Sequence, residues 1–353
     1  MDDLLIIGAG PTGLFAAFCA GMREMRVRVV ERLPEPGGQL AVLYPEKYIY
    51  DAPGYAKILA RELVNQLYQQ SQTFGKPVYC FEEQAKTLLR DGDAFTLGTD
   101  KGTYRARAVL VAAGIGAFAP NKVAVRGAEE GKPGIYYFVK SMDDFVGKRV
   151  LVVGGGDSAA DWALAIHDIA KAVTVVHRTD RFRAHEASVR RMLETVDVRT
   201  FHELKVVHGE ARVEGATIFD NRTGTENTIP VDAVVFALGF KADLGDLRQW
   251  QMEMDEPNRH IKVDPTMATS REGVFAAGDI TEVAYLQQQE LPEHQRQYDD
   301  THLSIPSPKY VEHKERWGLI VTGYAQAAVA VNFAKRHITP TASLSPGHSS
   351  AMR

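Results

Sequence analysis

The chain has 353 residues, of which 45% are hydrophobic and 24% charged, and its formal net charge is −4. This composition indicates a soluble globular protein with room for two domains, and it gives no sign of binding to nucleic acid or to an anionic membrane. No apolar run is long enough to span a bilayer, and the acidic start Met1–Asp3 does not resemble a secretory signal. Two cysteines, Cys19 and Cys80, allow at most one disulfide, and Cys19 is expected to be a buried free thiol. We therefore expect a cytoplasmic protein.

The chain opens with a pattern typical of a strand, a tight turn, a helix and a second strand. Residues 4–7 predict a buried parallel strand, residues 14–20 a helix, and residues 27–30 a strand that ends in Glu31. In the GxGxxG turn the first glycine permits the bend, the second lets a pyrophosphate approach the backbone, and the third allows close helix–strand packing. We expect phosphates at the positive end of this helix, with Glu31 holding ribose hydroxyls. The turn residues assigned to this site are Gly8, Gly10, Pro11, Thr12 and Gly13.

A second strand–glycine–helix unit begins about 145 residues after the first. Its second strand, residues 172–176, ends in His177 and Arg178 instead of an acid, and Arg183 follows. Arginine can bind a 2′-phosphate with two hydrogen bonds, whereas a carboxylate would repel it, so this unit is expected to bind NADPH rather than NADH. The alternative is a solvated loop that happens to be basic. The turn residues assigned to this site are Gly154, Gly156, Asp157, Ser158 and Ala159, where alanine replaces the third glycine.

Three further segments carry polar or aromatic groups that suit a ligand. Gly38 and Gln39 suggest backbone passing close to a ligand, although an ordinary loop would look the same. Residues 43–54 hold three tyrosines among prolines, which predicts either core filling or a platform for a flat ring. Residues 273–280 predict a strand that ends in a Gly-Asp pair, with Asp279 placed to accept hydrogen bonds from sugar or ribityl hydroxyls.

The rest of the chain predicts further strands and helices and one long polar segment. Residues 196–240 read as short strands with a hairpin turn at 221–224, and residues 281–316 read as a polar surface excursion of unassigned role. Alanine-rich residues 324–335 predict a helix. Other expected elements are a helix at 58–70 and strands at 77–80, 85–89, 94–99 and 104–113.

Together these features resemble the two-domain FAD/NAD(P)H reductases shaped like thioredoxin reductase. The fold implied is α/β, with two nested Rossmann-like dinucleotide-binding domains of the three-layer ββα type, and the likeness covers the chain except residues 281–316. Thioredoxin reductases carry Cys-x-x-Cys just before the second fingerprint, but Phe138 and Ser141 stand there here, which excludes disulfide reduction through that motif. Residues 43–51 and the tail residues 347–350 resemble the thioredoxin-reductase-like ferredoxin–NADP⁺ reductases of bacteria.

This resemblance implies a division of the chain. Residues 1–117 and 246–340 would form an FAD-binding domain, with an NADPH-binding domain at 118–245 inserted between them. Residues 341–353 would be a C-terminal tail over the flavin.

The resemblance also implies roles for single residues. Tyr44 would stack on one flavin face, and His348 would cover the other, supplied by the partner subunit of a homodimer. Ser349 could then reach the N5 region of the flavin. Asp51 and Gln39 would contact the polar edge of the ring. Two positions depart from the family's usual residues: Thr179 replaces a second arginine after the histidine, and Gln326 replaces a glutamate.

The activity implied is hydride transfer from NADPH to FAD, followed by single-electron transfer to ferredoxin or flavodoxin, without a redox-active dithiol or a metal site. Arg23, Arg26 and Arg28 are candidates for a basic face toward an acidic ferredoxin, although a solvated surface would look the same. An FAD-dependent oxidase or diaphorase acting on quinones, a redox-sensing flavoprotein with little turnover, and a flavin monooxygenase remain as alternatives.

Overall fold

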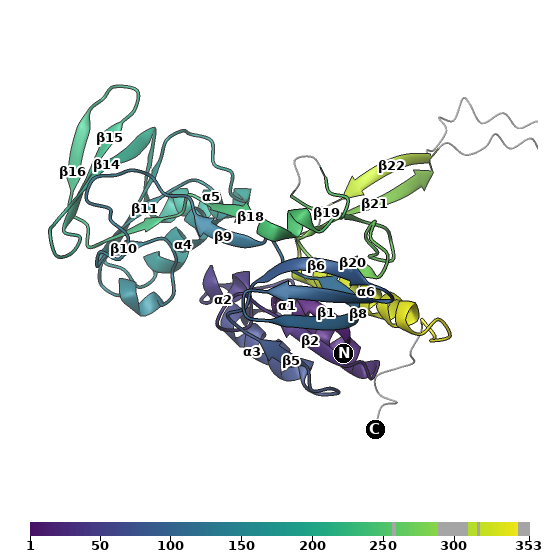
Figure 1. Ribbon diagram of the computed structural model, residues 1–353. Helices are drawn as coiled ribbons and strands as arrows, with labels where there is room; N and C mark the ends of the chain where they lie inside the picture. Colours follow the sequence, from purple (N-terminus) through teal and green to yellow (C-terminus); the bar gives the residue numbers. More distant parts are fainter. Residues whose placement is uncertain (256–258, 289–309, 316–317, 345–353) are drawn as a thin grey trace, which may run out of the picture. The chain divides into compact units, whose positions relative to one another are not determined.

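The computed structural model describes residues 1–255, 259–288, 310–315 and 318–344 (Figure 1). The chain forms two compact units. The first unit comprises Met1–Ala41, Tyr48–Gly116 and the chain from Asp243 onward, and the inserted unit comprises Val42–Lys47 and Ala117–Ala242. The short segment Val42–Lys47 is thus grouped with the inserted unit, whereas the sequence analysis assigned residues 1–117 to the first domain as one block.

The first unit is built on a mixed sheet with strand order β5-β2-β1-β8-β7-β6, in which β20 also pairs with β8. Strands β1, β2, β5, β8 and β20 pair in parallel, while β6, β7 and β8 form an antiparallel meander. Leu4, Leu5 and Ile6 are fully buried, as expected for a parallel strand covered on both faces. The bounds are β1 (Asp2–Ile7), β2 (Val27–Val30), β5 (Val78–Cys80), β6 (Ala85–Asp91), β7 (Ala94–Thr99), β8 (Thr103–Val111) and β20 (Val274–Ala276).

Three helices pack on this sheet and on one another: α1 (Pro11–Met22), α3 (Ala60–Ser71) and α6 (Ile320–Ile338). Helix α1 contacts both α3 and α6, and its buried side is lined by small residues such as Ala16, Ala17 and Ala20, which let the helix lie close to its neighbours. Figure 1 shows α1 and α6 beside the strands β1 and β8. Short elements complete this part of the unit: α2 (Gln39–Val42), β3 (Tyr48–Ile49), β4 (Ile58–Leu59) and the 3₁₀ helix η2 (Gly245–Gln249).

A separate three-stranded sheet, β19-β21-β22, includes described residues near both ends of the predicted polar excursion. Its strands are β19 (Ile261–Val263), β21 (Thr281–Gln288) and β22 (Tyr310–Glu315), and the last two pair as an antiparallel ribbon (Figure 1). The described residues near both ends of the polar surface excursion expected at 281–316 therefore form strands, and its role stays unassigned. Residues 281–288 do not alternate strictly between polar and apolar, so the two-residue period typical of a strand is absent from the sequence there.

The inserted unit has a fully parallel central sheet of order β10-β17-β11-β12-β13. One apolar cluster joins Val150, Val152 and Val175 to helix α4, and another joins Leu151 and Val234 to an antiparallel sheet on the opposite face. The result is three layers, with an antiparallel sheet, a parallel sheet and helices. The central strands are β10 (Ile135–Tyr136), β11 (Arg149–Val153), β12 (Ala172–His177), β13 (Asp197–Thr200) and β17 (Ala233–Phe236).

Two outer layers cover the central sheet of the inserted unit, one of helices and one of antiparallel strands. Helices α4 (Asp157–His167) and α5 (Glu186–Thr195) form one layer, and β14 (His202–His208), β15 (Gly215–Asp220) and β16 (Glu226–Ile229) form the other. The hairpin predicted at 221–224 joins β15 to β16, as their antiparallel pairing confirms. The remaining elements are β9 (Ala117–Pro120), which pairs with β18 (Phe240–Asp243), and the 3₁₀ helix η1 (Met142–Phe145). Within the described parts of the chain, no helix combines the length and apolar character that a membrane span needs.

Candidate nucleotide-binding sites

The first glycine turn joins β1 to α1, and at two of its glycines the neighbouring backbone leaves no room for a side chain. Gly8 has a φ of +105°, and a Cβ atom there would lie 2.4 Å from the carbonyl oxygen of Ala112. A Cβ on Gly13 would lie 1.9 Å from the carbonyl oxygen of Gly8. At Gly10, by contrast, a Cβ would meet nothing within 4 Å. The turn is therefore closed on its protein side and open at Gly10, where no side chain caps the N-terminus of α1.

A second glycine pair lies against this turn. The amide of Gly37 donates to the carbonyl oxygen of Ala9 over 2.8 Å. Gly38 has a φ of +54°, and its Cβ position is 3.2 Å from the Cα atom of Gly10. The structure thus brings the backbones of Gly10 and Gly38 together, although the two residues are 28 positions apart in the sequence.

The Glu31 carboxylate is only 7% exposed and is held by two backbone amides. Oε2 accepts from the amide of Ala9 over 2.6 Å, and Oε1 accepts from the amide of Leu33 over 2.8 Å. Burial raises the pKa of Glu31, and these amide hydrogen bonds lower it in part. Each oxygen retains a further lone pair, so the carboxylate can accept hydrogen bonds from a pair of vicinal hydroxyls beside the turn.

Three predicted residues from distant parts of the sequence meet around the strand end at Gly278. Gln39 donates from Nε2 to Oδ2 of Asp279 over 3.2 Å, and Oε1 of Gln326 accepts from the amide of Gly278 over 2.7 Å. Burial raises the pKa of Asp279, while the hydrogen bond from Gln39 and the nearby His260 lower it. This group of acceptors and donors belongs to the same unit as Gly10 and Glu31.

Asp51 lies at the N-terminus of α6. Its Oδ2 accepts from the amide of Ile320 over 2.7 Å, which places a negative charge at the positive end of a 19-residue helix. One turn along, the hydroxyl of Tyr324 is buried and has no hydrogen-bond partner among the described residues. Burial raises the pKa of Tyr324, and the negative charge of Asp51 adds to that shift. An unpartnered buried hydroxyl beside a helix N-terminus fits a polar ligand edge that would complete its hydrogen bonding.

The second glycine turn, between β11 and α4, repeats this design in the inserted unit. A Cβ on Gly154 would lie 2.3 Å from the carbonyl oxygen of Ala237 and 3.3 Å from the side chain of Ala159. At Gly156 a Cβ would meet nothing within 4 Å, and no side chain caps α4 there. The alanine at position 159 therefore fits where the first turn has Gly13. Asp157 accepts at Oδ1 from the amide of His185 over 2.8 Å, and Ser158 follows it in the first turn of α4.

The basic residues predicted for a 2′-phosphate lie just beyond β12. The ring of His177 packs on Gly155, 2.3 Å from where a Cβ would stand, and the amide of Arg183 donates to the carbonyl oxygen of Gly155 over 2.8 Å. The side chains of Arg178 and Arg183 are exposed, and no carboxylate of the described residues pairs with either guanidinium. Both guanidinium groups are therefore available to an anion near the second glycine turn.

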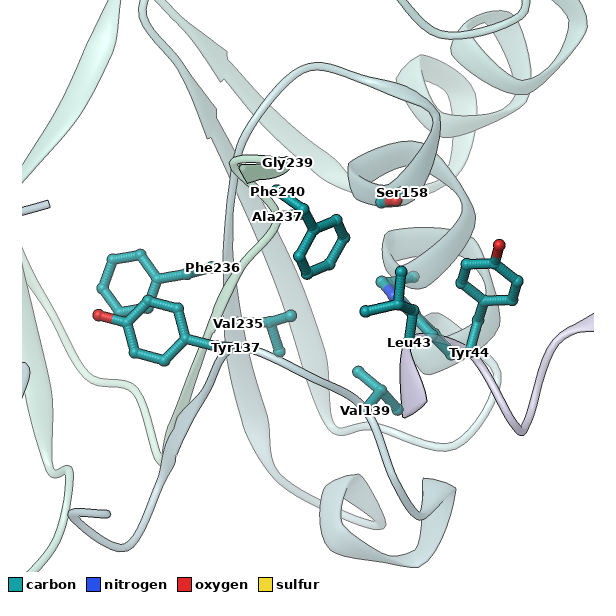
Figure 2. Close-up of a pocket in the computed structure, with 11 residues that line it drawn as sticks. Leu43, Tyr44, Tyr137, Val139, Ser158, Val235, Phe236, Ala237, Gly239 and Phe240 are labelled. Carbon is teal, nitrogen blue, oxygen red and sulfur yellow. The ribbon is translucent and has the colours of Figure 1, made fainter. Parts of the chain in front are cut away.

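Tyr44 is placed in the inserted unit, where it lines a pocket and packs against the apolar cluster around α4. Figure 2 shows Leu43 and Tyr44 beside Ser158, with Phe240 and Val139 on the other side of the pocket. The other candidate flavin residues of the described chain belong to the first unit, so the stacking of Tyr44 on a flavin stays a prediction. The lining residues are Leu43, Tyr44, Tyr137, Val139, Ser158, Trp162, Val235, Phe236, Ala237, Gly239 and Phe240.

The remaining candidates have different outcomes. His348 and Ser349 lie outside the described residues. The three arginines considered for a basic face all contact their own chain: Arg28 pairs with Asp2 over 2.8 Å, Arg26 with Asp3 over 3.6 Å, and Arg23 donates to the carbonyl oxygen of Ser343. Their charges are therefore partly neutralised or engaged.

Both cysteines are free, which confirms the prediction of an unpaired thiol at Cys19. Burial raises the pKa of the Cys19 thiol to about 12, so this thiol is neutral and unreactive at physiological pH.

Sequence reasoning missed two polar clusters. Asp255, only 3% exposed, accepts at Oδ2 from Nδ1 of His260 over 2.8 Å, and His260 in turn lies close enough to Asp279 to favour its charged form. Lys47 pairs with Asp161 over 2.8 Å. Lys47 and Asp161 are 114 positions apart, so no local pattern joins them, whereas Asp255 and His260 are only five positions apart but form no motif that the sequence analysis recognised.

Comparison with known proteins agrees with this geometry. The family model described as pyridine nucleotide-disulphide oxidoreductase matches residues 2–326. A ferredoxin–NADP reductase of Thermus thermophilus is 44% identical over 99% of this chain and 96% of its own length, and ferredoxin–NADP reductase 1 of Sulfolobus acidocaldarius is 44% identical over 99% and 98%.

Solved structures show the same fold. The crystal structure of Lactococcus lactis thioredoxin reductase in its FR conformation aligns with 96% of this chain and 100% of its own at a TM-score of 0.73 and 23% identity. The T. acidophilum thioredoxin reductase aligns with 95% and 97% at a TM-score of 0.73 and 22% identity. These findings confirm the predicted fold class and family resemblance, and the match to these relatives covers 99% of the chain, more than the predicted likeness, which left out residues 281–316. The chain belongs to the pyridine nucleotide-disulphide oxidoreductase family, and its full-length likeness within that family is to the ferredoxin–NADP reductases.

Proposed function

We propose that this protein is an oxidoreductase that takes electrons as hydride from NADPH and passes them singly to ferredoxin. The observation that carries the proposal is the presence of two open glycine turns in one chain, one followed by the acid Glu31 and the other by the bases Arg178 and Arg183. An acid suits the unphosphorylated ribose of FAD, and arginines suit the 2′-phosphate of NADPH. The names of the 44% identical relatives support the same activity.

The first unit has the features that an FAD molecule needs. The space at Gly10 and Gly38 would receive the pyrophosphate at the N-terminus of α1, and Glu31 would accept from the ribose hydroxyls. Asp279 would accept from the ribityl chain, with Gln39 fixing its orientation. When bound, FAD supplies the ability to accept a hydride and to release single electrons, which no amino-acid side chain has.

The polar edge of the flavin ring would lie near the N-terminus of α6. The positive end of this helix stabilises negative charge that develops on a neighbouring ring, and Asp51 limits that effect because it already caps Ile320. The buried hydroxyl of Tyr324 is a donor without a partner among the described residues, so it fits a ring oxygen or nitrogen. Gln326 supports the adjacent turn through the amide of Gly278.

The inserted unit would bind NADPH across the ends of β11 and β12. Gly156 precedes α4 and Asp157 and Ser158 begin it, so the free amides of this helix start would bind the pyrophosphate. Arg178 and Arg183 would bind the 2′-phosphate, with His177 holding Gly155 in place beneath it. We accordingly assign residues 1–117 and 246–340 to an FAD-binding domain and residues 118–245 to an NADPH-binding domain.

Several finer features belong to this proposal. Tyr44 would stack on one flavin face, while His348, followed by Ser349, would cover the other from the partner subunit of a homodimer. Flavodoxin would serve as an alternative electron carrier, and the protein would act in the cytoplasm. The chain holds two cysteines and no Cys-x-x-Cys, which leaves direct transfer from the flavin as the exit for electrons.

The test is anaerobic reduction of cytochrome c by NADPH and the purified protein, with and without added ferredoxin. A large increase that depends on ferredoxin is expected. Rapid bleaching of the flavin by NADPH without any effect of ferredoxin would contradict ferredoxin as the acceptor and favour a diaphorase acting on quinones. Absence of flavin from the purified protein, and failure to bind added FAD, would contradict the proposal as a whole.

A further inference from the structure

The segment Val42–Lys47 is docked on the inserted unit, although on both sides it continues into the first unit. Leu43 is 4% exposed, and Tyr44 packs against the cluster that includes Trp162. The amide of Lys47 donates to the carbonyl oxygen of Tyr44 over 3.0 Å, which closes the segment into a turn. The segment is thus a compact element that is seated by its apolar side chains.

Lys47 holds the end of this segment to helix α4. Its Nζ lies 2.8 Å from Oδ2 of Asp161, 5.2 Å from the centre of the Trp162 ring and 5.5 Å from the centre of the Tyr44 ring. The Lys47 side chain is 19% exposed and that of Asp161 is 43% exposed, so water weakens the ion pair but does not cancel it. Cation–π attraction to two rings adds to the same contact.

The pocket beside this segment lies where one half of a dinucleotide would extend. The sheet order places β12 and β17 on opposite sides of β11, so a ligand whose phosphates lie at the start of α4 reaches over β12 with one half and over β17 with the other. Arg178 and Arg183 mark the β12 side as the place of the 2′-phosphate. The β17 side, with Val235, Ala237 and Gly239, lines the pocket together with Ser158 of the first turn of α4.

Aromatic and apolar side chains line this pocket, but with the docked segment in place its cavity of about 20 Å³ is too small for a flat ring. Tyr137, Trp162 and Phe240 line it, and Leu43 and Tyr44 of the docked segment form one wall (Figure 2). We propose that segment Val42–Lys47 is a displaceable cover over the nicotinamide half of the NADP(H) site, that the Lys47–Asp161 ion pair latches it, and that Tyr44 reaches a flavin face only when the segment is displaced. This inference rests on the proposed function, because it requires that the inserted unit binds NADP(H).

A latched cover has a definite thermodynamic consequence. If only the uncovered state accepts the nicotinamide half, the apparent affinity for the whole nucleotide equals the intrinsic affinity multiplied by the fraction of molecules that are uncovered. Breaking the latch raises that fraction and therefore tightens binding of NADP⁺. A ligand that carries only the adenine half and the 2′-phosphate does not reach the pocket, so its affinity stays the same.

The experiment compares the dissociation constants of NADP⁺ and of 2′,5′-ADP by isothermal titration of the oxidised, flavin-loaded protein. Lys47→Met and Asp161→Asn are each expected to bind NADP⁺ about three- to fivefold more tightly, with 2′,5′-ADP binding unchanged. These variants alter net charge in opposite directions, so a general electrostatic effect on an anionic ligand would move them apart. The double variant Lys47→Glu with Asp161→Lys restores an ion pair and is expected to return the NADP⁺ affinity to that of the wild type.

Lys205→Met is the matched control, because it breaks the Lys205–Glu226 pair in the same unit away from the pocket, and it is expected to change neither constant. Unchanged or weaker NADP⁺ binding in both latch variants would overturn the inference, as would equal changes for both ligands. If the wild type binds neither ligand, the proposed function fails and the inference falls with it. If the wild type binds both ligands and the variants behave like Lys205→Met, only the latch is refuted.

Discussion

The open position in the first glycine turn provides a direct test of where FAD binds. Gly10 has φ −69° and ψ −179°, a conformation that alanine adopts without strain, and a Cβ there meets nothing within 4 Å. In the protein without FAD, Gly10→Ala is therefore expected to be neutral or to stabilise the fold by about 0.4–1 kcal/mol, since alanine loses less backbone entropy on folding. A thermal melt of the apoprotein measures this effect.

The same methyl group would stand in the space assigned to the pyrophosphate. Forcing a methyl group into an occupied site costs about 1–3 kcal/mol, which corresponds to a roughly 5- to 150-fold loss of FAD affinity. Titration of FAD into apoprotein, followed by quenching of flavin fluorescence, measures that loss. The prediction thus separates binding from folding within one substitution.

Two other glycines serve as controls. Gly156→Ala repeats the substitution at the second turn, where the backbone is also extended and open, and it is expected to weaken NADP⁺ while FAD binding is unchanged. Gly13→Ala should instead prevent stable folding, because its Cβ would lie 1.9 Å from a backbone oxygen. Wild-type affinity for FAD in Gly10→Ala, or loss of NADP⁺ binding with FAD retained, would refute the assignment of the first turn to FAD.

Three more substitutions test single residues. Arg178→Ala should raise KM for NADPH about tenfold or more and leave KM for NADH nearly unchanged in steady-state assays, because only NADPH has the extra phosphate. Asp51→Ala should lower the unfolding free energy of the apoprotein by about 1 kcal/mol in urea titrations, since it removes the acceptor at the α6 N-terminus. Burial opposes ionisation of Asp255, but hydrogen bonds from the His260 ring and from two backbone amides outweigh it, so the pKa of Asp255 lies below its usual value. The carboxylate therefore stabilises the fold above about pH 4 and loses that contribution as the pH falls through its lowered pKa, so Asp255→Asn should melt earlier than the wild type at neutral pH and approach it below pH 4.

Local sequence patterns were sufficient to predict the strands and helices that position the two glycine turns. The predicted strand at residues 27–30 matches β2, and the predicted strand at residues 172–176 lies within β12. The first helix is longer than predicted, Pro11–Met22 instead of 14–20, because proline at its first position needs no amide partner. Strands, glycine turns and helix starts depend on neighbours within a few residues, and for that reason they can be read from a single sequence.

The contacts that the sequence did not reveal join residues far apart along the chain. Asp51 caps a helix that starts 269 residues later, and Lys47 pairs with a carboxylate 114 residues away. Asp51 was selected for a role at the flavin edge, and its place at the α6 N-terminus adds a structural role which no local pattern could reveal. The grouping of Val42–Lys47 with the inserted unit was missed for the same reason, because sequence order alone assigned it to the first.

The difference between this chain and the thioredoxin reductases must lie in side chains, since the fold is shared. Where those enzymes carry a Cys-x-x-Cys, this chain has the ring of Phe138, stacked on Phe240 with centroids 5.6 Å apart and planes inclined by 13°. A disulfide relay requires two sulfur atoms whose Cα atoms are within about 7 Å, and neither Cys19 nor Cys80 has a second cysteine near it in sequence. An apolar stacking contact thus replaces the dithiol without disturbing the parallel sheet beside it. Under the proposed function electrons would then leave from the flavin, which suits a one-electron carrier better than a thiol substrate.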